Sequence, residues 1–341
     1  MSRSIRATLC ILLMTAGSGE ALAMTFKIAT LAPAGTTWMK EVKKGARAIT
    51  EKTDGRVRFK FYPAGVMGSD AIVLRKIRAG QLHGGAFSSA GLARLYPDIQ
   101  ALNIPMLFNG FDEVDYVRAR VEPVMKEQML KKGFVLLGIA ENGFTNILSQ
   151  SPIDDLESIR ASRLWVPEGD VMAKEILLSM DLSPVSLPIS DVFAGLQTGL
   201  IETVMVTPTA AIAMQWHDGA AYLIDTPLAY LVGFLAIQKR AFDKLSAEDR
   251  QIVEQEIDKA FDEMDRLTRI DNINALQALE NQGIQLVEPK AAELARWKRL
   301  SKRSVDSLIA RGALTREGVD RVMHYLEHYR SLRAQNGGET R

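Results

Sequence analysis

The chain has 341 residues, 47% of them hydrophobic and 24% charged, and its 42 basic and 41 acidic side chains leave a formal net charge of +1. This length is too great for one ordinary core and suits about two domains. The balanced charge gives no electrostatic footprint for a nucleic acid or an anionic membrane surface, so we expect neither as a partner.

The N-terminus has the pattern of a secretory signal peptide. Arg3 and Arg6 precede an apolar stretch over residues 7–16, and the Ala-Leu-Ala run at 21–23 matches a cleavage site between small residues. The apolar stretch is too short to span a bilayer as a helix, and the alternative interpretation is a short N-terminal core helix. We expect cleavage near Ala23 and a mature chain located in the periplasm.

The mature chain, from Met24 onward, is expected to lack thiols. The only cysteine, Cys10, lies inside the signal, so neither a disulfide nor a cysteine metal ligand is available. An oxidising compartment is compatible with this composition. The most apolar later stretch, 228–237, has the length of a strand, so we expect no membrane insertion of the mature chain.

A first α/β unit follows the signal. Its alternating apolar patterns, helix caps and turn residues predict, in order, a strand at 26–31, a helix at 38–52, a strand at 57–62, a helix at 69–79 and a strand at 84–87. Such a β-α-β-α-β run implies a mainly parallel sheet with helices on its faces.

A second α/β unit begins near Phe134. It contains predicted strands at 135–140, 164–166 and 185–187 and helices at 171–180 and 191–198. Long charged helical patterns then run over 246–281 and 289–333. Helices of this length at the end of an α/β chain can pack across both units.

The sequence shows no arrangement of catalytic or metal-binding residues. His324 and His328 share a helix face, but a metal site needs a third ligand and Glu327 lies off that face. The glycine cluster at 80–85 lacks the spacing and the lysine of a phosphate-binding loop. We therefore expect no catalytic residue, no metal and no cofactor, and a protein that is not an enzyme.

Several short blocks, taken together and in order, carry a family resemblance. They are Thr53-Asp54-Gly55-Arg56-Val57, Tyr62-Pro63, Gly80-Gln81-Leu82, Tyr96-Pro97-Asp98, Ile104-Pro105-Met106-Leu107-Phe108, Leu187-Pro188-Ile189-Ser190-Asp191-Val192-Phe193, Leu196-Gln197-Thr198-Gly199 and Lys239-Arg240-Ala241-Phe242-Asp243-Lys244-Leu245-Ser246. The sequence resembles the substrate-binding proteins of TRAP (tripartite ATP-independent periplasmic) transporters, in their DctP-like branch. The blocks at 188–193 and 196–199 distinguish it from a binding protein of an ABC transporter.

The resemblance implies a periplasmic binding protein-like α/β fold of two lobes with a cleft, a hinge and long bridging C-terminal helices. The expected ranges are 24–148 plus 232–275 for lobe I, 149–231 plus 276–333 for lobe II, and a flexible tail at 334–341. The implied partners are a small organic ligand and the TRAP membrane subunits. The segment 80–85 also resembles TRAP-type proteins that work with a small periplasmic helical-repeat lipoprotein.

One position departs from the family pattern in a way that concerns the ligand. The family places an arginine before a Val-Pro step to bind the ligand carboxylate through two hydrogen bonds, and here that residue is Trp165. Arg163 is two residues earlier, so on a strand it would point to the same face and could take over the role. An ordinary core position is the alternative interpretation of Trp165.

The other expected ligand-facing positions are also poor in positive charge. They are Leu31, Ile189, Val206 or, with a one-residue shift, Thr207, and Phe144 or Thr145; the polar groups left are Asn142 and Ser88. Removing one partner of a buried charge pair costs roughly 3 kcal/mol or more. We therefore predict a large, aromatic pocket for an apolar or amphipathic ligand and not for a typical dicarboxylate. The alternatives are a carboxylate anchored by Arg163 and a ligand sensor that uses the same fold.

Overall fold

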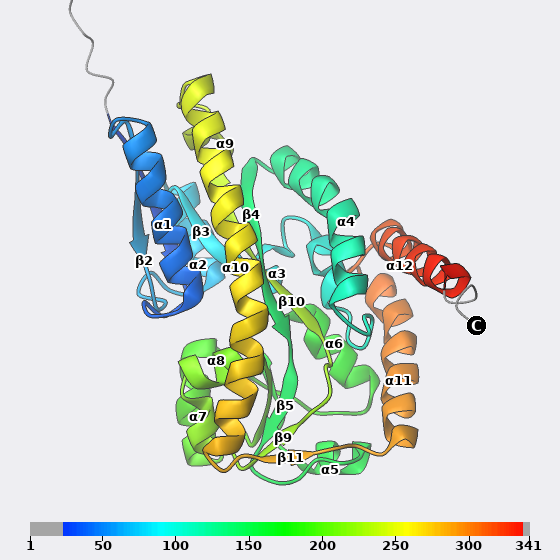
Figure 1. The fold of residues 1–341 in the computed structure, drawn as a ribbon. Coiled ribbons are helices and arrows are strands. Elements are labelled where there is room, and N and C mark those ends of the chain that lie inside the picture. Colours follow the sequence, from blue (N-terminus) through cyan, green and yellow to red (C-terminus); the bar gives the residue numbers. More distant parts are fainter. Residues whose placement is uncertain (1–22, 337–341) are drawn as a thin grey trace, which may run out of the picture.

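The computed structural model describes residues 23–336. They form two α/β lobes joined by strands and by one long helix, which confirms the predicted fold class (Figure 1). The predicted signal peptide, Cys10 included, lies outside the described residues. Within residues 23–336, no helix is both long enough and apolar enough to cross a membrane.

The first lobe is built on a five-stranded sheet in the order β2-β1-β3-β10-β4. β1, β2 and β3 are parallel, and β10 is antiparallel to both β3 and β4. The strands are β1 Met24–Thr30, β2 Val57–Tyr62, β3 Gly84–Ser88, β4 Phe134–Phe144 and β10 Tyr230–Gln238. The parallel part follows from the predicted β-α-β-α-β run, whereas the antiparallel strand β10 arrives from much later in the chain.

Helices cover both faces of this sheet. On one face, the apolar side of α1, with Met39, Val42 and Ile49, packs in a core that includes the long helix α10. On the other face, α4 contributes Val114, Val117 and Met125 to a second core. The helices of this lobe are α1 Thr37–Lys52, α2 Asp70–Arg78, α3 Ser89–Leu92, η1 Pro97–Asn103, α4 Phe111–Lys131 and α9 Lys239–Phe242.

The second lobe has a four-stranded sheet, β11-β9-β5-β8, and a separate parallel pair, β6-β7. Its strands are β5 Asn146–Ser149, β6 Trp165–Pro167, β7 Val185–Leu187, β8 Thr203–Val206, β9 Tyr222–Ile224 and β11 Gln285–Val287. Its helices are α5 Leu156–Ala161, α6 Val171–Ser179, η2 Ile189–Asp191, α7 Val192–Thr198, α8 Pro208–Ala213 and η3 Trp216–Gly219.

The long helix α10, Ala247–Asn281, serves both lobes (Figure 1). Phe261 and Met264, in its first half, pack into the core of the first lobe, while Leu279 packs into the core of the second. This helix and the strand connections β4-β5 and β9-β10 tie the lobes together.

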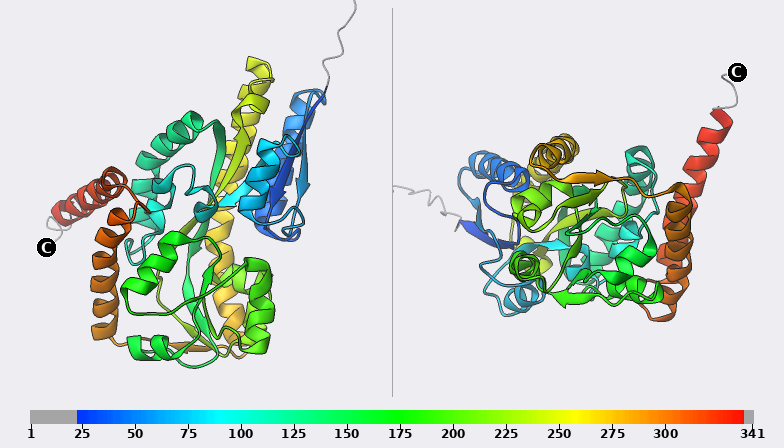
Figure 2. Two further views of the ribbon diagram at one scale, coloured as in Figure 1. Left: turned by 180° about the vertical axis from the view of Figure 1, so that it is seen from behind. Right: turned by 90° about the horizontal axis from the view of Figure 1, so that it is seen from below.

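The C-terminal region differs from the predicted lobe ranges. Gly312, with φ of +71°, separates α11, Ala291–Ala310, from α12, Arg316–Asn336. α12 packs against α4, and its Val319 and Leu326 join the core of the first lobe instead of the second lobe (Figure 2). The helical pattern over 289–333 is continuous in sequence, so it cannot show on which lobe each half lies.

Smaller differences concern the strands that run between the lobes. Residues 146–148, predicted in lobe I, belong to β5 of the second sheet, and 230–231, predicted in lobe II, belong to β10 of the first sheet. Helix α12 also continues two residues beyond the predicted start of the tail at 334. These boundaries fall where strand partners change, and hydrophobic alternation along one strand does not report its partner.

Glu113 on α4 holds α12 through a two-pronged ion pair. Arg330 donates from Nε to Oε1 and from Nη2 to Oε2, both at 2.8 Å, and the Asn109 N–H adds a bond of 2.8 Å to Oε2. Burial alone would raise the pKa of Glu113, but the bonds from Arg330 and Asn109 outweigh it and lower that pKa. The carboxylate therefore stabilises the docked helix when it is ionised.

We expect Glu113→Gln to loosen α12 at neutral pH, with faster hydrogen exchange over 316–336. Because the pKa of Glu113 is depressed in the fold, its stabilisation is present above the ordinary pKa and is lost as the pH falls through the folded value. The difference in unfolding temperature between wild type and variant should therefore vanish at acid pH. Asp112→Asn is the matched control, because Asp112 meets Arg333 only at 3.7 Å on the surface.

Candidate ligand-binding site

Trp165, Ile189 and Val206 are brought together in one apolar cluster of the second lobe. Trp165 is only 5% exposed, and its ring meets the ring of Trp216 edge-on with centroids 5.2 Å apart. Its indole N–H donates a 3.0 Å hydrogen bond to the carbonyl of Leu187 on the neighbouring strand β7. The position predicted for the family arginine is thus filled by an aromatic ring with its polar atom satisfied inside the lobe.

Thr207 and Val206 play different parts at the start of α8. Val206 is the last residue of β8 and is buried in the apolar cluster. Thr207 is the N-cap of α8, where its hydroxyl accepts from the N–H of Ala210 at 3.4 Å and Pro208 takes the first helical position. Thr207 thus directly precedes Pro208, and both Val206 and Thr207 remain predicted ligand positions.

Arg163, predicted as the alternative anchor for a ligand carboxylate, pairs with groups of its own lobe in this structure. Arg163 forms an ion pair with Glu202 and donates from Nε to the carbonyl of Gly199 at 2.7 Å, with 53% of its side chain exposed. Strand β6 begins only at Trp165, so the alternation that would place both side chains on one face does not reach back to Arg163.

Ser88 is a predicted ligand position that lies on the first lobe. It is the N-cap of α3, and its hydroxyl accepts from Gly91 N–H at 3.0 Å while donating to Asp70 Oδ2 at 2.7 Å. Burial raises the pKa of Asp70 despite the two hydrogen bonds from Ser88. The group next to the Ser88 hydroxyl is therefore the carboxyl group of Asp70.

Leu31, another predicted ligand position of the first lobe, follows β1 and is partly buried against Gly65.

Asn142 and Thr145 lie where β4 passes into β5. Thr145 is buried, and it exchanges backbone hydrogen bonds with the opposite segment, from its N–H to Ala229 O at 2.8 Å and from Leu228 N–H to its carbonyl at 2.9 Å. Its hydroxyl accepts from the N–H of Ala229 at 3.2 Å. This side chain holds the two crossing segments together, whereas Asn142 is exposed.

Comparison with known proteins shows to which family the chain belongs. The model of the bacterial extracellular solute-binding proteins, family 7, matches residues 28–311. The chain belongs to this family. The match confirms the resemblance to TRAP substrate-binding proteins, and the ligand-binding role follows from solute-binding proteins as a class.

Individual relatives of this family-7 protein are distant in sequence. The sialic acid-binding periplasmic protein SiaP of Vibrio cholerae is 22% identical over 285 residues, covering 83% of this chain and 88% of SiaP. The C4-dicarboxylate-binding periplasmic protein DctP of Rhodobacter capsulatus is 21% identical, covering 73% and 76%. The fold is close to that of the sugar acid binding protein DctPAm of Advenella mimigardefordensis, solved with galactonate, with a TM-score of 0.83 at 20% identity, covering 90% and 99%.

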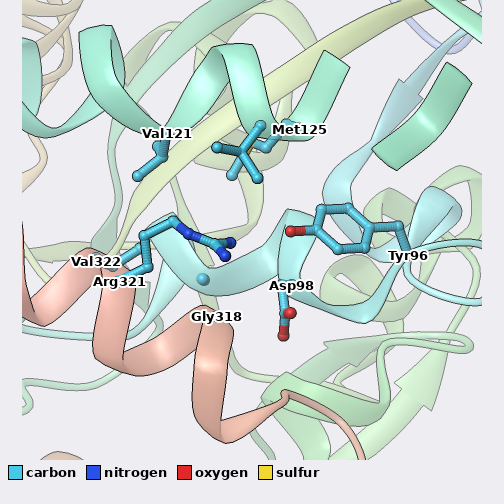
Figure 3. A pocket seen from close by; sticks show the side chains of 9 residues that line it. Tyr96, Asp98, Val121, Met125, Gly318, Arg321 and Val322 are labelled. Atoms are coloured by element: carbon cyan, nitrogen blue, oxygen red, sulfur yellow. The ribbon is translucent and has the colours of Figure 1, made fainter. Parts of the chain in front are cut away.

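Two hollows in this family-7 protein lie away from the predicted ligand residues. The hollow in Figure 3, between η1, α4 and α12, measures about 10 Å³, the space of about one water molecule. A second, of about 460 Å³, lies between α1 and β2 and is lined partly by Lys43, Arg47 and Lys60. Neither hollow is lined by a predicted ligand residue. The candidate site therefore rests on the predicted ligand positions and on the family match, and not on either hollow.

A buried charge network beside Asn142 was missed by the sequence analysis. Arg118 of α4 donates to the hydroxyl of Tyr230 at 2.9 Å and to Asp265 of α10 at 2.8 Å. Tyr230 donates to Glu141 at 3.1 Å, and Glu141 also accepts from Arg269 of α10 at 2.8 Å. Arg118, Asp265 and Arg269 lie on helices and Glu141 and Tyr230 on strands, so no local sequence pattern connects them and only the long-range pairing reveals the network.

Proposed function

We propose that this chain is the periplasmic subunit of a TRAP-type uptake system that captures a small organic ligand between its lobes and presents it to membrane subunits. We further propose that the ligand is apolar or amphipathic and carries no carboxylate bound by an arginine at the family position. The observation that carries this proposal is Trp165, packed on Trp216 and bonded to Leu187 where the family pattern has arginine.

The proposed ligand class differs from the ligands found in solved structures of similar fold. Structures of similar fold were solved with orotic acid, galactonate, β-D-galacturonate and L-gulonate, and each of these ligands is an acid. An ionised carboxylate placed against Trp165 and Val206 would lose its hydration without a cationic partner, which is very costly.

The direct test is to identify the molecule that the protein carries. Mature protein is purified from the periplasm without refolding, then denatured, and the released compounds are identified by mass spectrometry. The proposal expects a lipid-like, aromatic or otherwise uncharged compound in near-stoichiometric amount. Near-stoichiometric recovery of a mono- or dicarboxylate would overturn the ligand class while leaving the family assignment intact.

We also expect no rise in unfolding temperature when galacturonate, gulonate or succinate is added at millimolar concentration. A ligand that binds only the native state stabilises it by about 2.7 kcal/mol at one hundred times its Kd, so tight binding would be evident. The matched control is the Sulfitobacter relative solved with β-D-galacturonate, measured in the same plate. A rise for this chain comparable to that of the control would contradict the proposal.

A further inference from the structure

The side-chain amide of Asn272, on α10, uses its full hydrogen-bonding capacity. Oδ1 accepts from the hydroxyl of Thr209 at 2.8 Å and from its N–H at 3.2 Å. Nδ2 donates to the carbonyls of Asn142 at 3.1 Å and Thr268 at 3.0 Å. Two acceptances and two donations are all that an amide makes, so every hydrogen-bonding position of this amide is occupied.

These four bonds join three elements that belong to different parts of the clamp. Asn142 lies at the end of β4, just before the chain enters the second sheet, whereas Thr209 lies in the first turn of α8 in the second lobe. Thr209 is two residues beyond Thr207, one of the predicted ligand positions, and the two hydroxyls are 3.4 Å apart. Asn272 thus links the crossing strand, the long helix and the candidate site.

Gly143 leaves the space that the side-chain amide of Asn272 occupies. Its φ of +94° is in the left-handed region, and a Cβ built there would lie 2.6 Å from Asn272 Nδ2. A larger residue would therefore push the amide away from the carbonyl of Asn142. The conformation of the crossing strand and the position of the amide depend on each other.

We propose that Asn272 is a positioning residue that fixes the angle between the lobes by tying α8 and the crossing strand to the same point of α10. The inference builds on the proposed function, in which the lobes close on a ligand by a hinge motion. Its test uses the ligand-free protein, so a wrong ligand class would leave the result unchanged.

The distance between the lobes can be measured directly. Because the mature chain has no cysteine, Ala79→Cys on the first lobe and Ala194→Cys on the second, both exposed, accept spin labels at defined positions. Pulsed EPR then gives the distribution of interlobe distances. For Asn272→Ala we expect a broader distribution, with the population at the wild-type distance reduced about fivefold or more relative to the other distances.

Matched variants separate positioning from a general loss of stability. Asn274→Ala, at an exposed site on the same helix, should keep the wild-type distribution. Asn272→Asp can still accept from Thr209, but its carboxylate faces the carbonyl of Asn142, so it should broaden the distribution as alanine does. Thr209→Val, which removes the bonds of this hydroxyl to Asn272 and to Thr207, should broaden the distribution in the wild type and add nothing to Asn272→Ala.

One result would overturn the proposal, namely a distance distribution of folded Asn272→Ala that superimposes on that of the wild type. A lowered unfolding temperature alongside these unchanged distances would show a structural role alone. Should Asn272→Ala fail to fold, Thr209→Val decides by the same measurement, since it leaves the amide and its remaining three bonds in place.

Discussion

Replacing Trp165 with alanine is expected to lower the free energy of unfolding by about 3–5 kcal/mol. The ring is 95% buried, it packs on Trp216, and its N–H is bonded to the carbonyl of Leu187, so the variant loses apolar burial, an aromatic pair and a link between β6 and β7. Urea-induced unfolding followed by circular dichroism measures the change, since secondary structure does not depend on the deleted chromophore.

Trp165→Phe is the matched control for this experiment. It keeps a buried aromatic ring and removes the indole N–H, so it should cost about 1 kcal/mol for the lost hydrogen bond, with an added cost for the smaller ring. An alanine variant as stable as the wild type would contradict the packing of Trp165 seen here. It would also weaken the argument that this residue excludes a carboxylate by filling the second lobe.

Arg118→Ala is expected to destabilise the protein by about 3–5 kcal/mol, because it removes the buried cation that binds Glu122, Asp265 and the hydroxyl of Tyr230. Burial alone would lower the pKa of Arg118, but Tyr230, Glu122 and Asp265 raise it well above its ordinary value, which keeps the guanidinium charged. Burial also raises the pKa of Glu141. The loss should be measured by urea unfolding at neutral pH.

Arg120→Ala is the control on the same helix. Arg120 is exposed, and its guanidinium lies over the ring of Tyr116 at 3.4 Å from the centroid, on the surface of α4. Its removal should leave the stability close to that of the wild type. Equal effects of the two substitutions would show that the network around Arg118 contributes no more than a surface contact.

The elements of the first unit could be predicted because their signals are local. Thr36 caps α1, the Asp54-Gly55 turn lies between α1 and β2, and the alternation from Val57 to Phe61 lies in a strand. The place of β10 could not be predicted. Nothing in residues 230–238 tells that they insert antiparallel between β3 and β4, since that choice depends on partners far away in sequence.

The site was predictable to the extent that family motifs fix positions along strands. Trp165 lies on β6 as the motif implied, whereas Arg163 lies just before that strand and is paired with Glu202. The charge network could not be foreseen, since Arg118 and Asp265 are 147 residues apart. Asn272 carried no motif, and its role emerges only from the four atoms that surround it.

The repeated passage of the chain between the two sheets has a practical consequence. The connections β4-β5 and β9-β10, helix α10 and helix α11 each carry the chain from one lobe to the other, so no uninterrupted segment contains a whole lobe. A break at the exposed Gln282-Gly283 turn would leave a short fragment that supplies β11 to one lobe and α12 to the other. This turn is therefore a natural split point for a reporter in which two separately produced fragments reassemble across both lobes.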